Sequence, residues 1–179
     1  MPTQMTPKAQ RTVTEAVASF AESGFTLIEL LIVMSIMLVL MTLAVPQLLK
    51  LRKQSNEVSA IQSVRTIAQA QLQYNSQYPA NGFSCSLTTL GGAPGSAPSA
   101  QAAQLIPSDL STGQKAGYTF NITNCTKVTV NNQDMITGYT ITAVPQSAGK
   151  TGDNGFCADE NNTIRKDPAG GTNCTQPIQ

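Results

Sequence analysis

The sequence predicts an α+β protein in which one long N-terminal helix packs on a small antiparallel sheet. Three features of the 179-residue chain predict this fold. An uncharged apolar run covers residues 30–49. The following segment repeats apolar residues every three to four positions, which is typical of a helix with one buried face. Short runs of alternating apolar and polar residues then predict strands.

Residues 25–49 form the first half of the predicted helix. Twenty-five residues at 1.5 Å each span about 38 Å, whereas the hydrocarbon core of a bilayer is roughly 30 Å thick. We therefore expect residues 25–49 to cross a membrane. Pro46 lies within this segment, and because proline removes a helical hydrogen bond and clashes with the preceding turn, we expect a kink there.

Residues 50–78 are predicted to continue the same helix with a single apolar face. Pro79 disfavours helix at the residue before it, so the helix should end near Tyr78. We expect the apolar face of this half of the helix to pack against the rest of the chain. The apolar positions that define its expected docking face are Leu51, Val58, Ile61, Val64, Ile67 or Ala68, and Leu72.

Residues 79–179 are predicted to form the antiparallel sheet domain. Only 16 of these 101 residues are Leu, Ile, Val or Phe, so the domain must bury its apolar side chains against the helix. Residues 91–103, rich in Gly, Ala, Pro and Ser, are expected to be a surface loop.

Five short segments carry the strand prediction. Alternation is clear at residues 118–122 and 139–143, and a third short run covers 127–130, with 131–134 as the turn between the last two. A smaller hairpin is expected from residues 156–159 and 163–165, around 160–162.

All four cysteines lie on the C-terminal side of the apolar run: Cys85, Cys125, Cys157 and Cys174. An even number on one side of a membrane segment predicts two disulfides in an oxidising compartment. Four buried free thiols in a cytosolic domain are the alternative. If disulfides form, three pairings are open.

Composition argues against an enzyme and against nucleic-acid binding. The chain has no histidine, which excludes Ser-His-Asp and Cys-His catalysis and His-based metal sites. It has no glycine-rich nucleotide motif and no CxxC pair, so we expect no cofactor. The net charge is +1 with few aromatic residues, so no basic patch for nucleic acid is indicated.

The segment Gly24-Phe25-Thr26-Leu27-Ile28-Glu29 resembles the processing motif of type IV pilins and of type II secretion pseudopilins. The resemblance covers residues 22–49 closely and the rest only as architecture. It implies a leader at residues 1–24, cleavage between Gly24 and Phe25 by a prepilin peptidase, and methylation of the new amine on Phe25. It assigns residues 25–49 to a filament core, in which Pro46 and Glu29 are assembly residues.

By this resemblance the chain is a structural subunit of a type IV pilus-like filament, built from like subunits by an inner-membrane assembly platform. The alternatives are a secretion pseudopilin and a membrane-anchored binding module that does not polymerise. The precursor is expected in the inner membrane with its sheet domain in the periplasm, then in a surface pilus or a periplasmic pseudopilus. The charges flanking the apolar run favour the opposite orientation, but disulfides and leader removal require this one.

Glu29 has a local interpretation as well, because Thr26 and Glu29 have the spacing of a capping box. Loop length together with the resemblance favours the disulfide pairs Cys157–Cys174 and Cys85–Cys125. In the resembled family, the major pseudopilin usually holds calcium in its C-terminal loop. No metal site is predicted here, and the weak candidate ligands are Asp153, Asp159, Glu160 and Asp167.

Overall fold

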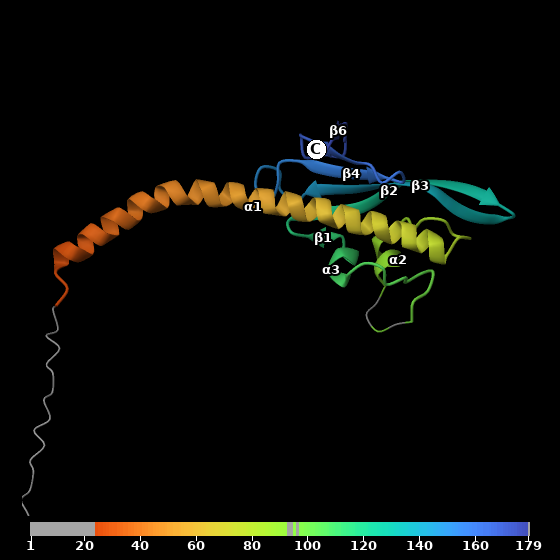
Figure 1. Ribbon diagram of the computed structural model, residues 1–179, viewed down its shortest axis with the longest axis horizontal. Helices are drawn as coiled ribbons and strands as arrows, with labels where there is room; N and C mark the ends of the chain where they lie inside the picture. Colours follow the sequence, from red (N-terminus) through yellow and green to blue (C-terminus); the bar gives the residue numbers. More distant parts are fainter. Residues whose placement is uncertain (1–23, 93–94, 96, 179) are drawn as a thin grey trace, which may run out of the picture. The chain divides into compact units, whose positions relative to one another are not determined.

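A single long helix, α1 (Leu27–Gln77), dominates the computed structural model, which describes residues 24–92, 95 and 97–178 (Figure 1). The predicted helix is confirmed, starting two residues later than expected and ending next to Tyr78. The amide of Tyr78 donates a last hydrogen bond to the Tyr74 carbonyl (2.8 Å). The predicted leader, residues 1–24, lies outside the described residues except for Gly24.

The chain divides into two units, Met1–Met41 and Thr42–Gln179. The described part of the first unit is the short segment before α1 and the start of the helix, and all its residues are exposed. Its polar groups are paired locally: the Ser35 hydroxyl donates to the Leu31 carbonyl at 2.7 Å. An apolar helix can therefore carry this serine without leaving its hydroxyl unpaired.

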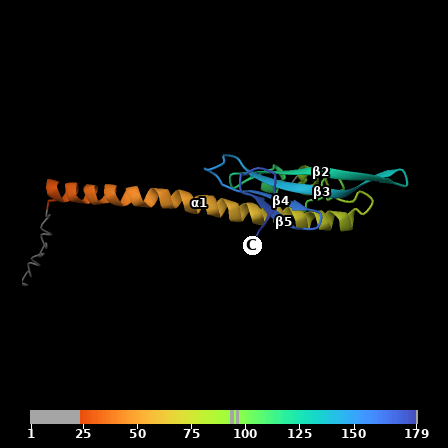
Figure 2. The same cartoon turned by 90° about the horizontal axis from the view of Figure 1, so that it is seen from above.

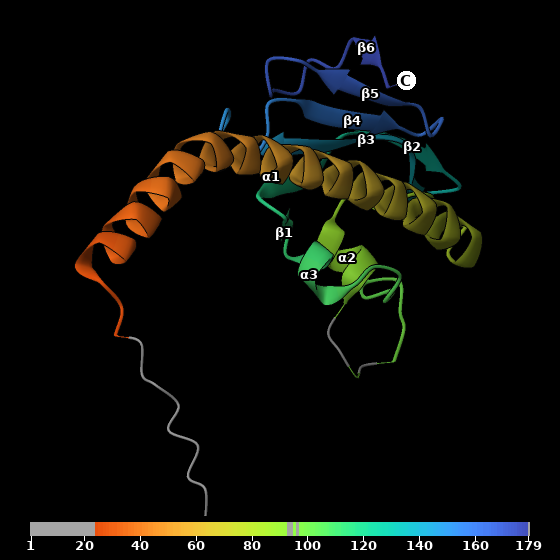
Figure 3. The same ribbon diagram turned by 60° about the vertical axis from the view of Figure 1, so that its left-hand side comes forward.

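The second unit contains a six-stranded antiparallel sheet in which neighbours in sequence are neighbours in space, β1-β2-β3-β4-β5-β6. Figure 2 shows α1 alongside the sheet, and Figure 3 shows β4–β6 on one side of α1 and two short helices on the other. The elements are β1 (Gln114–Lys115), β2 (Tyr118–Val130), β3 (Gln133–Pro145), β4 (Gly155–Asp159), β5 (Ile164–Asp167), β6 (Gln176–Pro177), α2 (Leu87–Gly91) and α3 (Ser108–Ser111).

The core of the second unit lies between α1 and the sheet. Burial alternates as predicted at the start of β2, where Tyr118 and Phe120 are fully buried, whereas in β3 Ile141 is buried together with its neighbours Thr142 and Ala143. On the helix, Val64 and Ile67 are buried against them in the same cluster. The predicted fold, a helix packed on a small antiparallel sheet, is confirmed.

The buried face of α1 matches the predicted one only in part, since Val64, Ile67 and Ala68 are buried as predicted. Three residues assigned to it, Leu51, Val58 and Leu72, are 60%, 54% and 47% exposed. The buried face consists mainly of small or polar residues, because small side chains let the helix backbone approach the sheet closely. Its members are Ala60, Ser63, Val64, Ile67, Ala68, Ala70, Gln71 and Tyr74.

The third predicted strand run, residues 127–130, is not a separate strand. It continues β2, which passes through an irregularity between Thr123 and Thr126. The turn is also shorter than predicted. Only Asn131 and Asn132 form it, both with left-handed φ of 52° and 65°, as a two-residue hairpin loop requires.

The hairpin predicted around residues 160–162 is present as β4 and β5. Of the predicted loop 91–103, residues 93, 94 and 96 lie outside the described residues, Gly91 closes α2, and Ala103 is buried. No sequence pattern predicted α2, α3, β1 or β6, because elements of two to five residues are too short to show periodicity.

Candidate functional site

The Gly24–Phe25 peptide bond precedes α1 and is open to the surroundings. Phe25 is 78% exposed, and a Cβ added to Gly24 would meet no atom of the described chain within 4 Å. The fold of the chain therefore makes no steric demand for glycine at residue 24. A requirement for glycine there must come from a molecule that binds this segment.

Glu29 caps the start of α1. Its Oε2 accepts hydrogen bonds from the backbone amide of Thr26 (2.9 Å) and from the Thr26 hydroxyl (2.8 Å). In return, the Glu29 amide donates to Thr26 Oγ1 at 3.2 Å. This is the reciprocal arrangement of a capping box. It uses one carboxylate oxygen, and Oε1 accepts no hydrogen bond from the described residues.

The helix that follows is long and apolar enough to cross a membrane. None of its residues from Leu27 to Arg52 is buried or half-buried by the described chain. Pro46 lies inside α1, and the helix continues beyond it to Gln77. This apolar surface therefore needs cover from outside the chain, from lipid or from other helices.

These features lie in one recognisable segment. Residues 20–45 match the prokaryotic N-terminal methylation motif. No curated protein and no solved structure matches the chain. The matched residues include Gly24, Phe25 and Glu29, whereas Pro46 lies one position beyond them.

The methylation motif is typical of type IV pilins and pseudopilins. The match confirms the resemblance seen in the sequence and supports a pilin- or pseudopilin-type precursor. It further implies processing by a prepilin peptidase and assembly into filaments, and it indicates a structural protein. The apolar N-terminal helix fits a membrane-anchored precursor.

A polar clamp, formed by Lys53, Glu57, Asp153 and Asn154, fixes the loop between β3 and β4 on α1. The Glu57 carboxylate accepts from the amides of Asp153 (2.8 Å) and Asn154 (3.1 Å) and from Asn154 Nδ2 (2.9 Å). Lys53 pairs with Asp153 at 2.8 Å. Sequence reasoning missed this clamp, because its partners are about a hundred positions apart.

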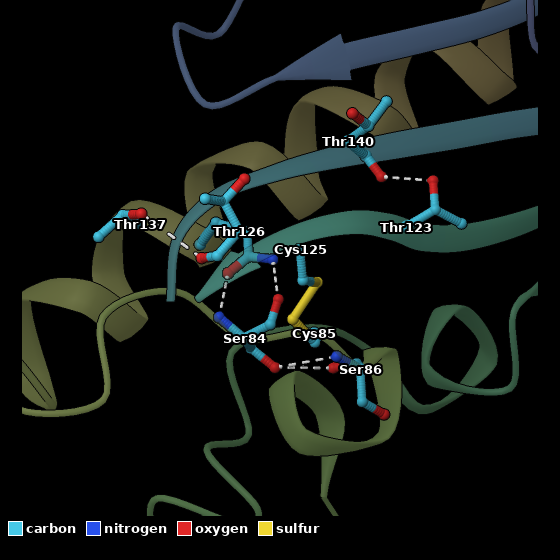
Figure 4. Close-up of a disulfide and its surroundings, with 9 residues drawn as sticks. Ser84, Cys85, Ser86, Thr123, Cys125, Thr126, Thr137 and Thr140 are labelled. Atoms are coloured by element: carbon cyan, nitrogen blue, oxygen red, sulfur yellow. Dashed lines mark hydrogen bonds between the residues drawn. A yellow bond between two sulfur atoms is a disulfide. The ribbon is translucent and has the colours of Figure 1, made fainter. Parts of the chain in front are cut away.

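Two disulfides close the sheet domain, with the pairing that the resemblance implies. Cys85–Cys125 joins the segment after α1 to β2, with Cα atoms 6.1 Å apart (Figure 4). Cys157–Cys174 joins β4 to the segment before β6, with Cα atoms 5.9 Å apart. The irregularity in β2 surrounds Cys125, where Asn124 has a left-handed φ of 50°.

Three of the four weak calcium candidates make other contacts. Asp153 pairs with Lys53. Asp159 accepts from the amides of Asn161 and Thr163, and Asp167 from those of Ala169 and Asn173. Glu160 is exposed. Within residues 24–92, 95 and 97–178, no group of three or more acidic residues or cysteines is placed to hold a metal ion.

Charges in the second unit shift a few pKa values. The Lys115 ammonium lowers the pKa of Asp109, and hydrogen bonds from Thr129 and Lys127 lower the pKa of Asp134. Burial raises the pKa of Tyr139 to about 12, with a smaller contribution from Glu160 and Asp159. Burial also raises the pKa of Tyr118, whose hydroxyl donates to the Asn154 carbonyl.

Proposed function

We propose that the chain is a structural subunit of a type IV pilus-like filament. A prepilin peptidase cuts between Gly24 and Phe25 and methylates the new amine. The mature chain waits in the inner membrane with its sheet domain in the periplasm. An assembly platform then moves the apolar part of α1 from lipid into a filament core of like helices, and the filament reaches the cell surface.

The observation that carries this proposal is the exposure of α1 within the matched motif, residues 20–45, and just beyond it. Fully burying one Leu, Ile or Val side chain stabilises a structure by about 1.5–3 kcal/mol. Large apolar residues from Leu27 to Leu51 are 45–89% exposed in the described chain. Neighbouring helices of the same kind would bury this surface along its whole length.

Glu29 gives the assembled state its advantage over the free one. A charged side chain at the centre of a bilayer costs at least about 2.5–3.5 kcal/mol on insertion scales. The capping box occupies Oε2, which leaves Oε1 for the amine on Phe25 of a neighbouring subunit. The local cap and the intermolecular ion pair are therefore compatible.

Mass spectrometry and one pair of variants test the proposal. The intact mass of the native protein should show loss of residues 1–24 and one added methyl group. Glu29→Gln keeps an oxygen for the cap but removes the charge. Co-expressed with wild type, it should be cleaved normally and enter filaments about tenfold less often, the factor that about 1.4 kcal/mol produces.

Thr26→Val is the matched control, since it weakens the cap and keeps the charge. It should enter filaments nearly as often as wild type. If both variants lose incorporation equally, Glu29 acts as a helix cap. Full-length protein in sheared filaments, or an absence of filaments, would refute the proposed function.

A further inference from the structure

The tip of the β2–β3 hairpin is an apolar surface with no cover. Among the described residues that follow α1, the exposed large apolar side chains are Val128 and Val130, at 43% and 47%. They are two positions apart in β2 and therefore face the same side of the strand. Figures 1 and 2 show this tip extending beyond the C-terminal end of α1. The Lys127–Asp134 ion pair (3.0 Å) braces it.

The same unit carries a groove with a partly apolar lining. It has a volume of about 760 Å³ and lies between α1 and strands β4–β6. Its apolar lining is Val58, Ile61, Phe156, Pro177 and Ile178. Val58 is more than half exposed, and it continues the apolar surface of the N-terminal part of α1 toward the groove.

One acidic and one basic side chain flank these two surfaces. Glu160 and Lys50 are both exposed, and neither forms an ion pair with any residue that the structure describes. Glu160 stands beside Gly138, whose added Cβ would lie 3.8 Å from its Cδ, and Gly138 pairs with Thr126. Glu160 thus lies at the base of the hairpin tip.

The spacings of the two surfaces agree. Thr126 and Val130 are four strand residues, about 13 Å, apart. Lys50 precedes Val58 by eight helical residues and Ile61 by eleven, about 12 and 16 Å. Eleven residues are close to three full turns, so Lys50 and Ile61 lie on the same side of α1. Along the axis of α1, the distance from Glu160 to Val130 therefore matches the distance from Lys50 to the groove.

We propose that the hairpin tip of one copy docks in the groove of a second copy, with Glu160 of the first paired to Lys50 of the second. Two different surfaces meet, so the contact is head-to-tail and can repeat without closing into a ring. Because the hairpin projects along α1, the contact adds copies along the helix. This inference rests on the proposed filament and specifies a second contact within it.

The pair cannot form within one copy. Tyr118 is level with Glu57, since both bond Asn154. Glu160 lies beside Thr126, eight strand residues beyond Tyr118, and Lys50 lies seven helical residues before Glu57. One copy therefore separates Lys50 from Glu160 by on the order of 30 Å, and a direct bond between them must join two copies.

A zero-length cross-link tests the contact in the full chain. A carbodiimide condenses a lysine amine with a touching carboxylate, and peptide mass spectrometry locates the product. The membrane fraction and sheared filaments would be taken from cells that mix light and heavy isotope-labelled copies. A Lys50–Glu160 product that joins light and heavy peptides is expected. The Lys53–Asp153 pair, 2.8 Å apart, supplies the product expected within each copy.

Charge reversal adds a functional readout. Lys50→Glu or Glu160→Lys should remove the product and lower filament yield by about two- to fivefold, the range for an exposed ion pair. The double swap should restore the yield. Lys150→Glu, at an exposed lysine in the loop between β3 and β4, is the control and should change nothing. Val128→Ser with Val130→Ser should also reduce the product.

The outcomes separate this contact from the filament itself. Filaments that give the Lys53–Asp153 product without the Lys50–Glu160 product overturn the contact and leave the filament. The Lys50–Glu160 product in membranes of cells that make no filaments supports the contact and refutes the filament. Absence of both the product and the filaments refutes both.

Discussion

Gln71 offers the sharpest test of how α1 is held to the rest of the second unit. Its side chain is fully buried, and it pairs with both backbone groups of Ser84, itself 3% exposed. Nε2 donates to the Ser84 carbonyl at 2.6 Å, and Oε1 accepts from the Ser84 amide at 2.8 Å. One side chain therefore pairs both backbone hydrogen-bonding groups of the residue that precedes Cys85.

Gln71→Leu keeps the side-chain volume but leaves the two Ser84 groups buried without partners. Each unpaired group costs about 1–3 kcal/mol, and the apolar leucine offsets part of that cost, so we expect a net loss of about 2–4 kcal/mol. For a unit of this size, the midpoint of thermal unfolding should fall by about 10 °C.

The assay is thermal unfolding of the full chain in detergent, followed by near-ultraviolet circular dichroism of tyrosine. All four tyrosines lie in the second unit, so the signal reports that unit and not the apolar N-terminal helix. Gln73→Leu, at an exposed position two residues away, is the matched control and should change stability by less than about 0.5 kcal/mol. Equal stability of the two variants would refute the assigned role of Gln71.

Two further predictions concern the disulfides and the buried tyrosines. Replacing Cys85 and Cys125 by serine should destabilise the unit by about 4 kcal/mol, and replacing Cys157 and Cys174 by about 3 kcal/mol, because the first disulfide closes the longer loop. Denaturant unfolding of each double variant measures these two losses. A larger loss for the Cys157–Cys174 variant would contradict the prediction. Tyr139 has a pKa of about 12 in the folded chain and about 10 when unfolded, so its contribution to stability is complete below pH 10 and is lost as pH rises toward 12. Tyr139→Phe should flatten the fall of stability over that interval, and an unchanged slope in alkaline unfolding curves would contradict the assignment.

The sequence predicted the features that repeat or that lie close together along the chain. Alternation located β2 and β3, and the proline at residue 79 located the end of α1. The spacing of Thr26 and Glu29 predicted the hydrogen bonds that the structure shows between them. These signals are local, because a few neighbouring residues determine each one.

Contacts between distant parts of the chain gave no such signal. The hydrogen bonds between Gln71 and Ser84, and those from Asp153 and Asn154 to Glu57, depend on where the chain returns to α1. Nothing about an isolated glutamine or glutamate in a polar stretch predicts burial or a partner. The candidate site was easier to predict, because its residues lie within one short segment at the start of the helix.

The docking face of α1 was predicted only in part, and the difference bears on the proposed filament contacts. Large aliphatic residues at helical spacing indicated the buried face, yet the sheet covers Ala60, Ala68 and Ala70 while Val58 and Leu72 stay exposed. Small side chains at the contact let a helix pack closely on a sheet, so only some of the large ones, here Val64 and Ile67, are needed there. The exposed residues of the second half of α1 extend the apolar surface of the first half. The sheet is therefore held by one side of α1 through small residues, through Val64 and Ile67, and through hydrogen bonds, while Leu51, Val58 and Leu72 remain exposed for the subunit contacts proposed above.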